Sequence, residues 1–218
     1  MSNPASKSPN GIFEFGGIRE AVLTIEKAEA LLAQVSHIRD PQHIRLSNKS
    51  FSPEAATCIA EVLRGFKNIA TAEISDIIAG RAEEDALRTL KIICESIEGN
   101  SLIELNVSDN ALGSKGVKAC QSLFVCKSLK CLYACNNGLS GDACDLVAEL
   151  LLGGGCPLLT TLHFYNNMSG DGGAIAIAGT SECNFLTSRV SNGQRAFERT
   201  FFLTSHPSIG FLPACRSS

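Results

Sequence analysis

At 218 residues, with 44% hydrophobic and 19% charged side chains, the chain is long enough for one sizeable domain and too apolar to be intrinsically disordered. A formal net charge of −3 gives no basic surface for nucleic acid, and no stretch approaches the roughly 20 apolar residues that span a bilayer. The polar residues 1–11 lack the apolar core of a secretory signal. We therefore expect an intracellular, cytoplasmic protein whose ten cysteines remain reduced thiols.

The first patterned segment follows an N-terminal extension over residues 1–19. Ala21–Leu23 is a short apolar stretch, and Thr24 and an expected helix over residues 25–35 follow it. We expect this segment to be a degenerate first repeat that caps one end of the fold.

Five later segments share one pattern, an apolar-x-apolar run that ends in Asn or Asp. They are Ile44–Asn48, Ala72–Asp76, Leu105–Asn110, Leu132–Asn137 and Leu162–Asn167. Their fifth residues lie 28, 33, 27 and 30 positions apart. The alternation is typical of a strand with one buried face, and the Asn or Asp of a turn that tolerates unusual dihedral angles.

A helix is expected to return the chain after each strand. Between the first two strands, Ser52 is a candidate N-cap, Pro53 fits the first helical position, and Gly65 marks the helix end. One strand and one helix cannot bury their apolar faces alone, but stacked units form a parallel sheet and a helical layer. We predict an α/β leucine-rich-repeat solenoid of the ribonuclease-inhibitor type over residues 20–179, with five to six repeats, strands inside and helices outside.

The repeat pattern ends after Gly179. Residues 180–218 show neither the strand pattern nor a helix with a clear apolar stripe. An irregular cap over the last repeat is one interpretation. We favour an out-of-pattern C-terminal tail that leaves Ile175 and Ile177 poorly covered.

Four stretches resemble the leucine-rich-repeat domain of Ran GTPase-activating proteins, the plant members above all. They are Ile74-Ser-Asp-Ile-Ile-Ala-Gly-Arg81, Val107-Ser-Asp-Asn-Ala-Leu-Gly113, Leu132-Tyr-x-x-Asn136-Asn137-Gly138 and His163-Phe-x-Asn-Asn-Met-x-Gly-Asp171. The Gly-Arg pair that ends the first stretch is the most specific, because generic repeats lack it.

This resemblance implies stimulation of GTP hydrolysis on the GTP form of the small GTPase Ran, and so a role in nucleocytoplasmic transport. It implies that Arg81 supports binding and positioning, and that Asn136 helps orient the catalytic glutamine of the GTPase and its attacking water. Asp76, Asp109, Asn110 and Asn137 are then expected to face the partner on loops along one rim. The chain would have no active site of its own, no cofactor and no metal.

The sequence departs from that family in three ways. Plant members carry a targeting domain with a Trp-Pro-Pro motif, whereas this chain has no Trp. Nuclear-envelope association is therefore expected only through partners. The later repeats and acidic tail of the family are missing, and Cys135 stands beside Asn136, where relatives vary.

Other interpretations remain open for the same residues. Asn and Asp after a strand satisfy turn backbone in any such repeat, and an isolated surface arginine is usually solvated. The spacing of Cys126, Cys131, Cys135 and Cys144 lacks the paired C-x-x-C of structural zinc sites. The alternatives to a GTPase activator are an interaction scaffold without such activity, or a truncated inactive form.

Overall fold

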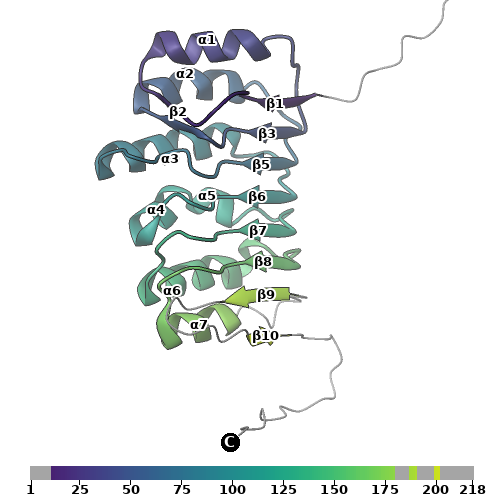
Figure 1. The fold of residues 1–218 in the computed structure, drawn as a ribbon. Coiled ribbons are helices and arrows are strands. Elements are labelled where there is room, and N and C mark those ends of the chain that lie inside the picture. Colours follow the sequence, from purple (N-terminus) through teal and green to yellow (C-terminus); the bar gives the residue numbers. More distant parts are fainter. Residues whose placement is uncertain (1–10, 180–186, 191–198, 202–218) are drawn as a thin grey trace, which may run out of the picture.

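The computed structural model describes residues 11–179, 187–190 and 199–201, and all structural statements below concern these residues. Short strands stack on one side of a solenoid and helices line the other (Figure 1). The main sheet runs in the order β1 (Ile12–Glu14), β3 (His43–Arg45), β5 (Thr71–Glu73), β6 (Glu104–Asn106), β7 (Cys131–Tyr133), β8 (Thr161–His163), β9 (Thr187–Val190) and β10 (Arg199–Phe201). Neighbouring strands are parallel except β10, which is antiparallel to β9.

The connections between these strands are helical. The helices are α1 (Ile25–Val35), α2 (Pro53–Leu63), α3 (Glu83–Ile97), α4 (Gly113–Ala119), α5 (Gln121–Phe124), α6 (Gly141–Leu150), the single π-helical turn η1 (Leu151–Gly155) and α7 (Gly170–Gly179). The predicted caps of α2 are confirmed, since the Ser52 hydroxyl accepts from the Ala55 N–H and Pro53 is the first helical residue. The predicted leucine-rich-repeat fold with strands inside and helices outside is confirmed.

The apolar-x-apolar pattern forms the core as expected. The two apolar residues of each of the five predicted strands are buried, with at most 1% of their surface exposed: Ile44, Leu46, Ala72, Ile74, Leu105, Val107, Leu132, Ala134, Leu162 and Phe164. They face the buried stripes of the helices, for example Ile59 and Leu63 of α2 and Leu90 and Ile93 of α3. Each unit therefore completes its core with its neighbours, as a solenoid requires.

A ladder of buried asparagines joins the ends of the middle strands. The Asn110 Oδ1 accepts from the Ile77 N–H, the Asn137 Oδ1 from the Asn110 N–H, and the Asn167 Oδ1 from the Asn137 N–H, each at 2.9 Å. The side-chain amides donate in turn to backbone carbonyls of their own or the preceding unit. This asparagine ladder (Asn110, Asn137, Asn167) satisfies turn backbone that would otherwise be buried without partners.

The fifth residue of each of the five repeat segments has a left-handed backbone. Asn48, Asp76, Asp109, Asn136 and Asn166 have φ values of 65, 54, 62, 52 and 57°. Asn and Asp enter this region more readily than other residues with a Cβ. The Asn or Asp at the fifth position of each repeat segment is therefore the residue where the chain turns sharply out of a strand.

The N-terminal unit differs from the prediction. Its strand in the main sheet is β1, which lies within residues 1–19 and buries Phe13 and Phe15. The predicted strand at Ala21–Leu23 forms as β2 (Glu20–Val22), but it pairs with β4 (Lys49–Phe51) in a separate two-stranded sheet. Strand β1 was not predicted because it is not followed by the Asn or Asp that ends the other repeat segments.

The C-terminal end also differs in part. Strand β9 pairs in parallel with β8, although its sequence lacks the repeat pattern, because backbone hydrogen bonds to an edge strand need no particular side chains. Ile175 is 72% exposed, as expected, whereas Ile177 is only 2% exposed. Helix α7 packs tightly on α6, since a Cβ at Gly173 would come within 3.0 Å of the Cys144 Sγ. The other residues of 180–218 lie outside the described part of the chain.

The ladder gives a first prediction. Asn137→Ala removes an acceptor and a donor from a wholly buried site and leaves the Asn110 N–H and the Val107 carbonyl without these partners. We expect the free energy of unfolding to fall by about 2–4 kcal/mol, because each buried polar group left unpaired costs about 1–3 kcal/mol. Urea denaturation measures this loss. Gln121→Ala on the exposed surface of α5 is the control, and an equally small change in both variants would contradict the prediction.

Candidate functional site

A cleft of about 790 Å³ opens between the strand ends and the helices of the middle repeats. We call it the rim cleft. It is lined by Arg19, Ser47, Asn48, Glu73, Ser75, Asp76, Ile78, Ala79, Gly80, Arg81, Glu83, Ala86, Leu87, Leu90, Asp109, Asn110, Ala111, Leu112, Lys115 and Asn136. The two residues expected to carry function, Arg81 and Asn136, therefore lie in one cleft although they come from different repeats.

The loop between β5 and α3 places Arg81. Gly80 has φ of 71°, a conformation that residues with a Cβ rarely adopt, and the Arg81 N–H donates to the Ile78 carbonyl at 3.1 Å. Arg81 is half-buried, and its Nε is buried without a hydrogen-bond partner among the described residues. The Arg81 side chain lines the rim cleft and forms no ion pair among the described residues, whereas its buried Nε is closed to solvent.

Asn136 lies in a second row of side chains, exposed above the buried ladder. Its Nδ2 donates to the Asp109 Oδ1 at 2.7 Å, and its Oδ1 accepts from the Asn166 Nδ2 at 2.9 Å. We call these three residues the rim row. A side-chain amide has two N–H groups and two lone pairs. After these two bonds, one N–H and one lone pair of Asn136 remain for a partner.

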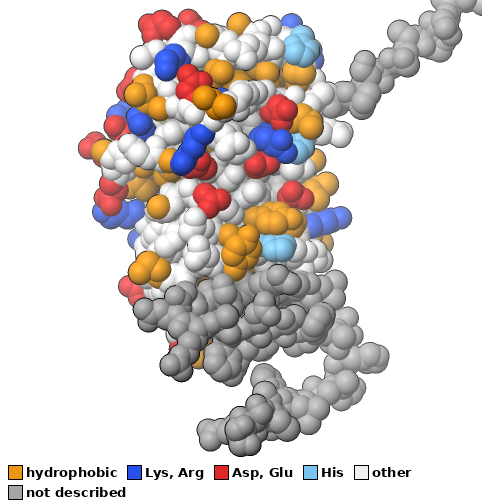
Figure 2. Space-filling model, in the orientation of Figure 1, with side chains coloured by type: hydrophobic (Ala, Val, Ile, Leu, Met, Phe, Trp, Pro, Cys, Tyr) orange, Lys and Arg blue, Asp and Glu red, His pale blue; other side chains and the backbone are white. Residues whose placement is uncertain are grey.

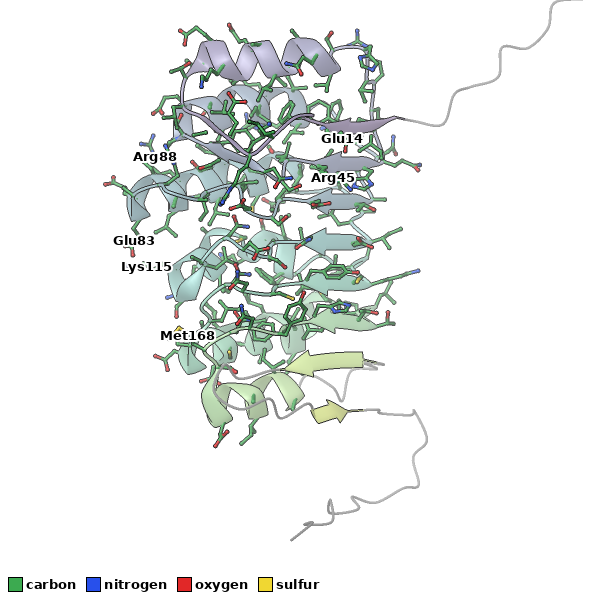
Figure 3. All side chains as sticks on the ribbon, viewed as in Figure 1. Glu14, Arg45, Glu83, Arg88, Lys115 and Met168 are labelled. Carbon is green, nitrogen blue, oxygen red and sulfur yellow. The ribbon has the colours of Figure 1, made fainter. Side chains whose placement is uncertain are left out.

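The charged residues of the rim cleft mostly pair within the chain. Asp76 accepts from the Arg19 Nη2 at 2.6 Å, and Lys115 lies 2.5 Å from Glu83. Figure 3 shows Glu83 and Lys115 at the outer, helical edge, reaching from α3 and α4. Glu73 pairs with Arg45, which also binds Glu14 on the sheet. Among the described residues, Arg81 and Asp109 remain outside any ion pair in the cleft.

Four residues were expected to face a partner, and the structure separates them. Asp76 and Asp109 line the rim cleft, and Asp109 is exposed. Asn110 and Asn137 are only 2% and 0% exposed, and they belong to the asparagine ladder. We therefore assign these two asparagines to the scaffold that holds the rim, because their side chains hydrogen-bond the backbone of neighbouring strands.

The sequence is similar to several curated proteins. It is 41% identical to RAN GTPase-activating protein 1 of Arabidopsis thaliana over 121 residues, 55% of this chain and 23% of that protein. It is 38% identical to RAN GTPase-activating protein 2 of the same plant over 125 residues, 55% of this chain and 22% of that protein. The chain resembles Ran GTPase-activating proteins. Ran GTPase-activating protein 1 of Xenopus laevis is 29% identical over 140 residues, 61% of this chain and 24% of that protein.

The expected resemblance to the plant proteins is thus confirmed, and it covers about half of this chain. The chain spans about a quarter of the length of these Ran GTPase-activating proteins. No protein-family model matches the chain. The activity and the partners of these relatives are therefore only proposed for this chain.

Arg19 is a charged residue of the cleft that sequence reasoning did not single out. Arg19 lies in the segment that was treated as an N-terminal extension, yet it crosses to Asp76, 57 residues further along the chain. No local pattern marks it. Its position follows only from the pairing of β2 with β4, which was itself not predicted.

The remaining polar candidates have structural surroundings. His163 stacks on Tyr133 across β7 and β8, with ring centroids 4.5 Å apart. In the described part of the chain, no group of three or more His, Cys, Asp or Glu side chains is arranged to hold a metal ion. No helix in the described ranges is long and apolar enough to cross a membrane.

The cysteines of the described residues are free thiols. Cys156 is 3% exposed, and its burial raises the pKa of the thiol from an ordinary value of 9.0 to about 12. Between about pH 9 and 12, the thiol therefore retains its proton in the native state, whereas the unfolded chain has lost it. This contribution to stability is complete below about pH 9 and is lost as the pH rises toward 12.

This shift gives a second prediction. Between pH 8 and 11, the unfolding free energy of wild type should fall more steeply than that of Cys156→Ala, because only wild type must release this proton on unfolding. Guanidinium denaturation at several pH values measures the two slopes. Parallel slopes would show that the thiol titrates alike in both states.

Proposed function

We propose that this chain stimulates GTP hydrolysis by Ran in its GTP form, without an active site of its own. The observation that carries the proposal is the meeting of Arg81 and Asn136 in the rim cleft, in a chain 41% identical over 121 residues to a Ran GTPase-activating protein. Action on Ran implies an intracellular, cytoplasmic location and a role in nucleocytoplasmic transport.

Asn136 is the residue that acts on the reacting groups in this proposal. Hydrolysis of GTP depends on orienting the attacking water, and a glutamine of the GTPase commonly does so. The exposed amide of Asn136 retains one N–H and one lone pair, which match the carbonyl and amino groups of a glutamine side chain. Because two neighbours already hold the Asn136 amide, little conformational freedom is lost when the glutamine binds.

Arg81 acts in docking. Its half-buried side chain lines the rim cleft and forms no ion pair among the described residues, so its guanidinium is available to a carboxylate or carbonyl acceptor on the GTPase. The rim cleft also offers the exposed carboxylate of Asp109 to a basic residue of the partner. Asp76 is bound to the exposed Arg19, and surface ion pairs of this kind contribute about 0–1 kcal/mol. A cation of the GTPase can therefore replace Arg19 at little cost.

An interaction scaffold without GTPase-activating activity is the second candidate. Acidic and basic side chains are interspersed over the face in Figure 2, as in many protein-binding surfaces. The scaffold and the activator differ in one observable, the hydrolysis rate of bound GTP at saturating concentrations of the chain.

Single-turnover hydrolysis of GTP on Ran is the test. We expect the wild-type chain to accelerate hydrolysis, and Asn136→Ala to lower the rate at saturation by about 100-fold, since one lost positioning or charge-stabilising hydrogen bond costs about 10²–10³-fold. Gln121→Ala, outside the rim cleft, should keep the wild-type rate. A well-folded wild-type chain that binds Ran without acceleration would establish the scaffold instead.

Arg81→Ala separates docking from rate. We expect the concentration of the chain at half-maximal acceleration to rise at least tenfold, with a smaller change at saturation, because the lost contact is made before and during the reaction alike. Arg88→Ala is the matched control, an exposed arginine of α3 outside the rim cleft (Figure 3). Equal effects of the two substitutions would remove Arg81 from the docking surface.

A further inference from the structure

We propose that Asp109 and Asn166 are positioning residues that fix which end of the Asn136 amide faces each neighbour. The inference rests on the proposed function, because it concerns the residue that meets the glutamine of the GTPase. It assigns to Asn166 a role that its place in the repeat does not suggest, since each strand end carries an Asn or Asp.

Asp109 sets the direction of the hydrogen bonds along the rim row. An ionised carboxylate accepts hydrogen bonds and donates none, so the group 2.7 Å from the Asp109 Oδ1 must be the NH₂ of Asn136. The Oδ1 of Asn136 then faces the next unit, where the Asn166 Nδ2 donates to it at 2.9 Å. The acceptor at one end and the donor at the other both favour a single orientation. An asparagine between two asparagines has no such preference, because either orientation pairs a donor with an acceptor.

The backbone holds all three side chains in place. Asp109, Asn136 and Asn166 have nearly the same φ, 62, 52 and 57°, and each follows a parallel strand in register with the next. The Asp109 N–H donates to the Cys135 carbonyl at 3.0 Å, and the Asn136 N–H donates to the Tyr165 carbonyl at 3.1 Å. The rim row is therefore a rigid chain of hydrogen bonds above the buried ladder.

The orientation of the Asn136 side-chain amide decides which donor and acceptor groups it offers to a partner. With its NH₂ toward Asp109, its second N–H and the second lone pair of its Oδ1 occupy defined positions at the rim cleft. Reversing the amide would exchange these two groups. A glutamine that donates to Asn136 in one orientation would then meet an N–H in the same place, and an N–H pair facing an N–H is repulsive.

An exchange of the two neighbours tests this role. Asp109→Asn with Asn166→Asp keeps the net charge and provides one donor and one acceptor for the Asn136 amide, and Asp tolerates the left-handed backbone, as Asp76 and Asp109 do. The carboxylate now lies on the other side, so the Asn136 NH₂ must turn toward residue 166. Asp109→Asn alone is the reference, because it removes the carboxylate from the cleft as the exchange does but leaves Asn166 as a donor.

The readouts are the free energy of unfolding and single-turnover GTP hydrolysis on Ran at saturating chain. We expect Asn166→Asp alone to be less stable than wild type, because Asn136 then lies between two carboxylates. The exchanged variant should regain the stability of Asp109→Asn yet hydrolyse GTP at least tenfold more slowly than that reference at saturation. Contacts of the Asn136 side-chain amide protons, seen by NMR, should move from Asp109 to residue 166.

Two results would overturn the inference. Equal saturating rates of the exchanged variant and Asp109→Asn, with the amide reversed, would show that orientation does not matter and that the rim row is only structural. An amide that stays unreversed in the exchanged variant would show that Asp109 and Asn166 do not set it. A wild-type chain without any acceleration is a different failure, because it rejects the proposed function itself.

Discussion

The three buried asparagines of the ladder hold the architecture on which the rim cleft depends. Asn110, Asn137 and Asn167 each replace backbone partners that a sharp turn cannot provide, and each side chain accepts from an N–H of the preceding unit at 2.9 Å. Because the bonds run from repeat to repeat, the strand ends are held in register with one another. Any side chain placed just before a ladder residue is then held at a fixed spacing along the rim.

In this arrangement, consecutive residues have different roles, one structural and one exposed at the rim. In the pair Asn136–Asn137, the first residue is exposed with φ of 52°, and the second is wholly buried. The buried asparagine stabilises the turn, and the turn holds the exposed one at the surface of the rim. A sequence of two asparagines therefore combines a buried structural residue and an exposed one. Identity of residue type alone does not distinguish them, but burial does.

Much of this could be predicted from the sequence, because the repeat carries its own physical signals. The apolar alternation placed β3, β5, β6, β7 and β8 to within one residue, and the Asn or Asp markers identified the left-handed positions. The candidate residues Arg81 and Asn136 came from resemblance, and the structure places both in one cleft. The features that were not predicted depend on contacts between parts of the chain that lie far apart in the sequence. Strand β1 lacks the marker, Arg19 reaches Asp76 across 57 residues, and β9 adds to the sheet through its backbone alone.

The position of the rim cleft in the solenoid shows which repeats support it. Repeats in a solenoid contact only their neighbours, so a site needs its own units and one further unit on each side. The cleft draws its residues from the ends of β3, β5, β6 and β7, from α3 and α4, and from Arg19 of the first unit, and β1 and β8 flank these strands in the sheet. The side chain nearest the C-terminal end, Asn136, is supported by Asn166 after β8. Among the described residues, both side-chain hydrogen bonds of Asn136 therefore join residues within 109–166, so the repeats of β6, β7 and β8 are the ones that hold its amide.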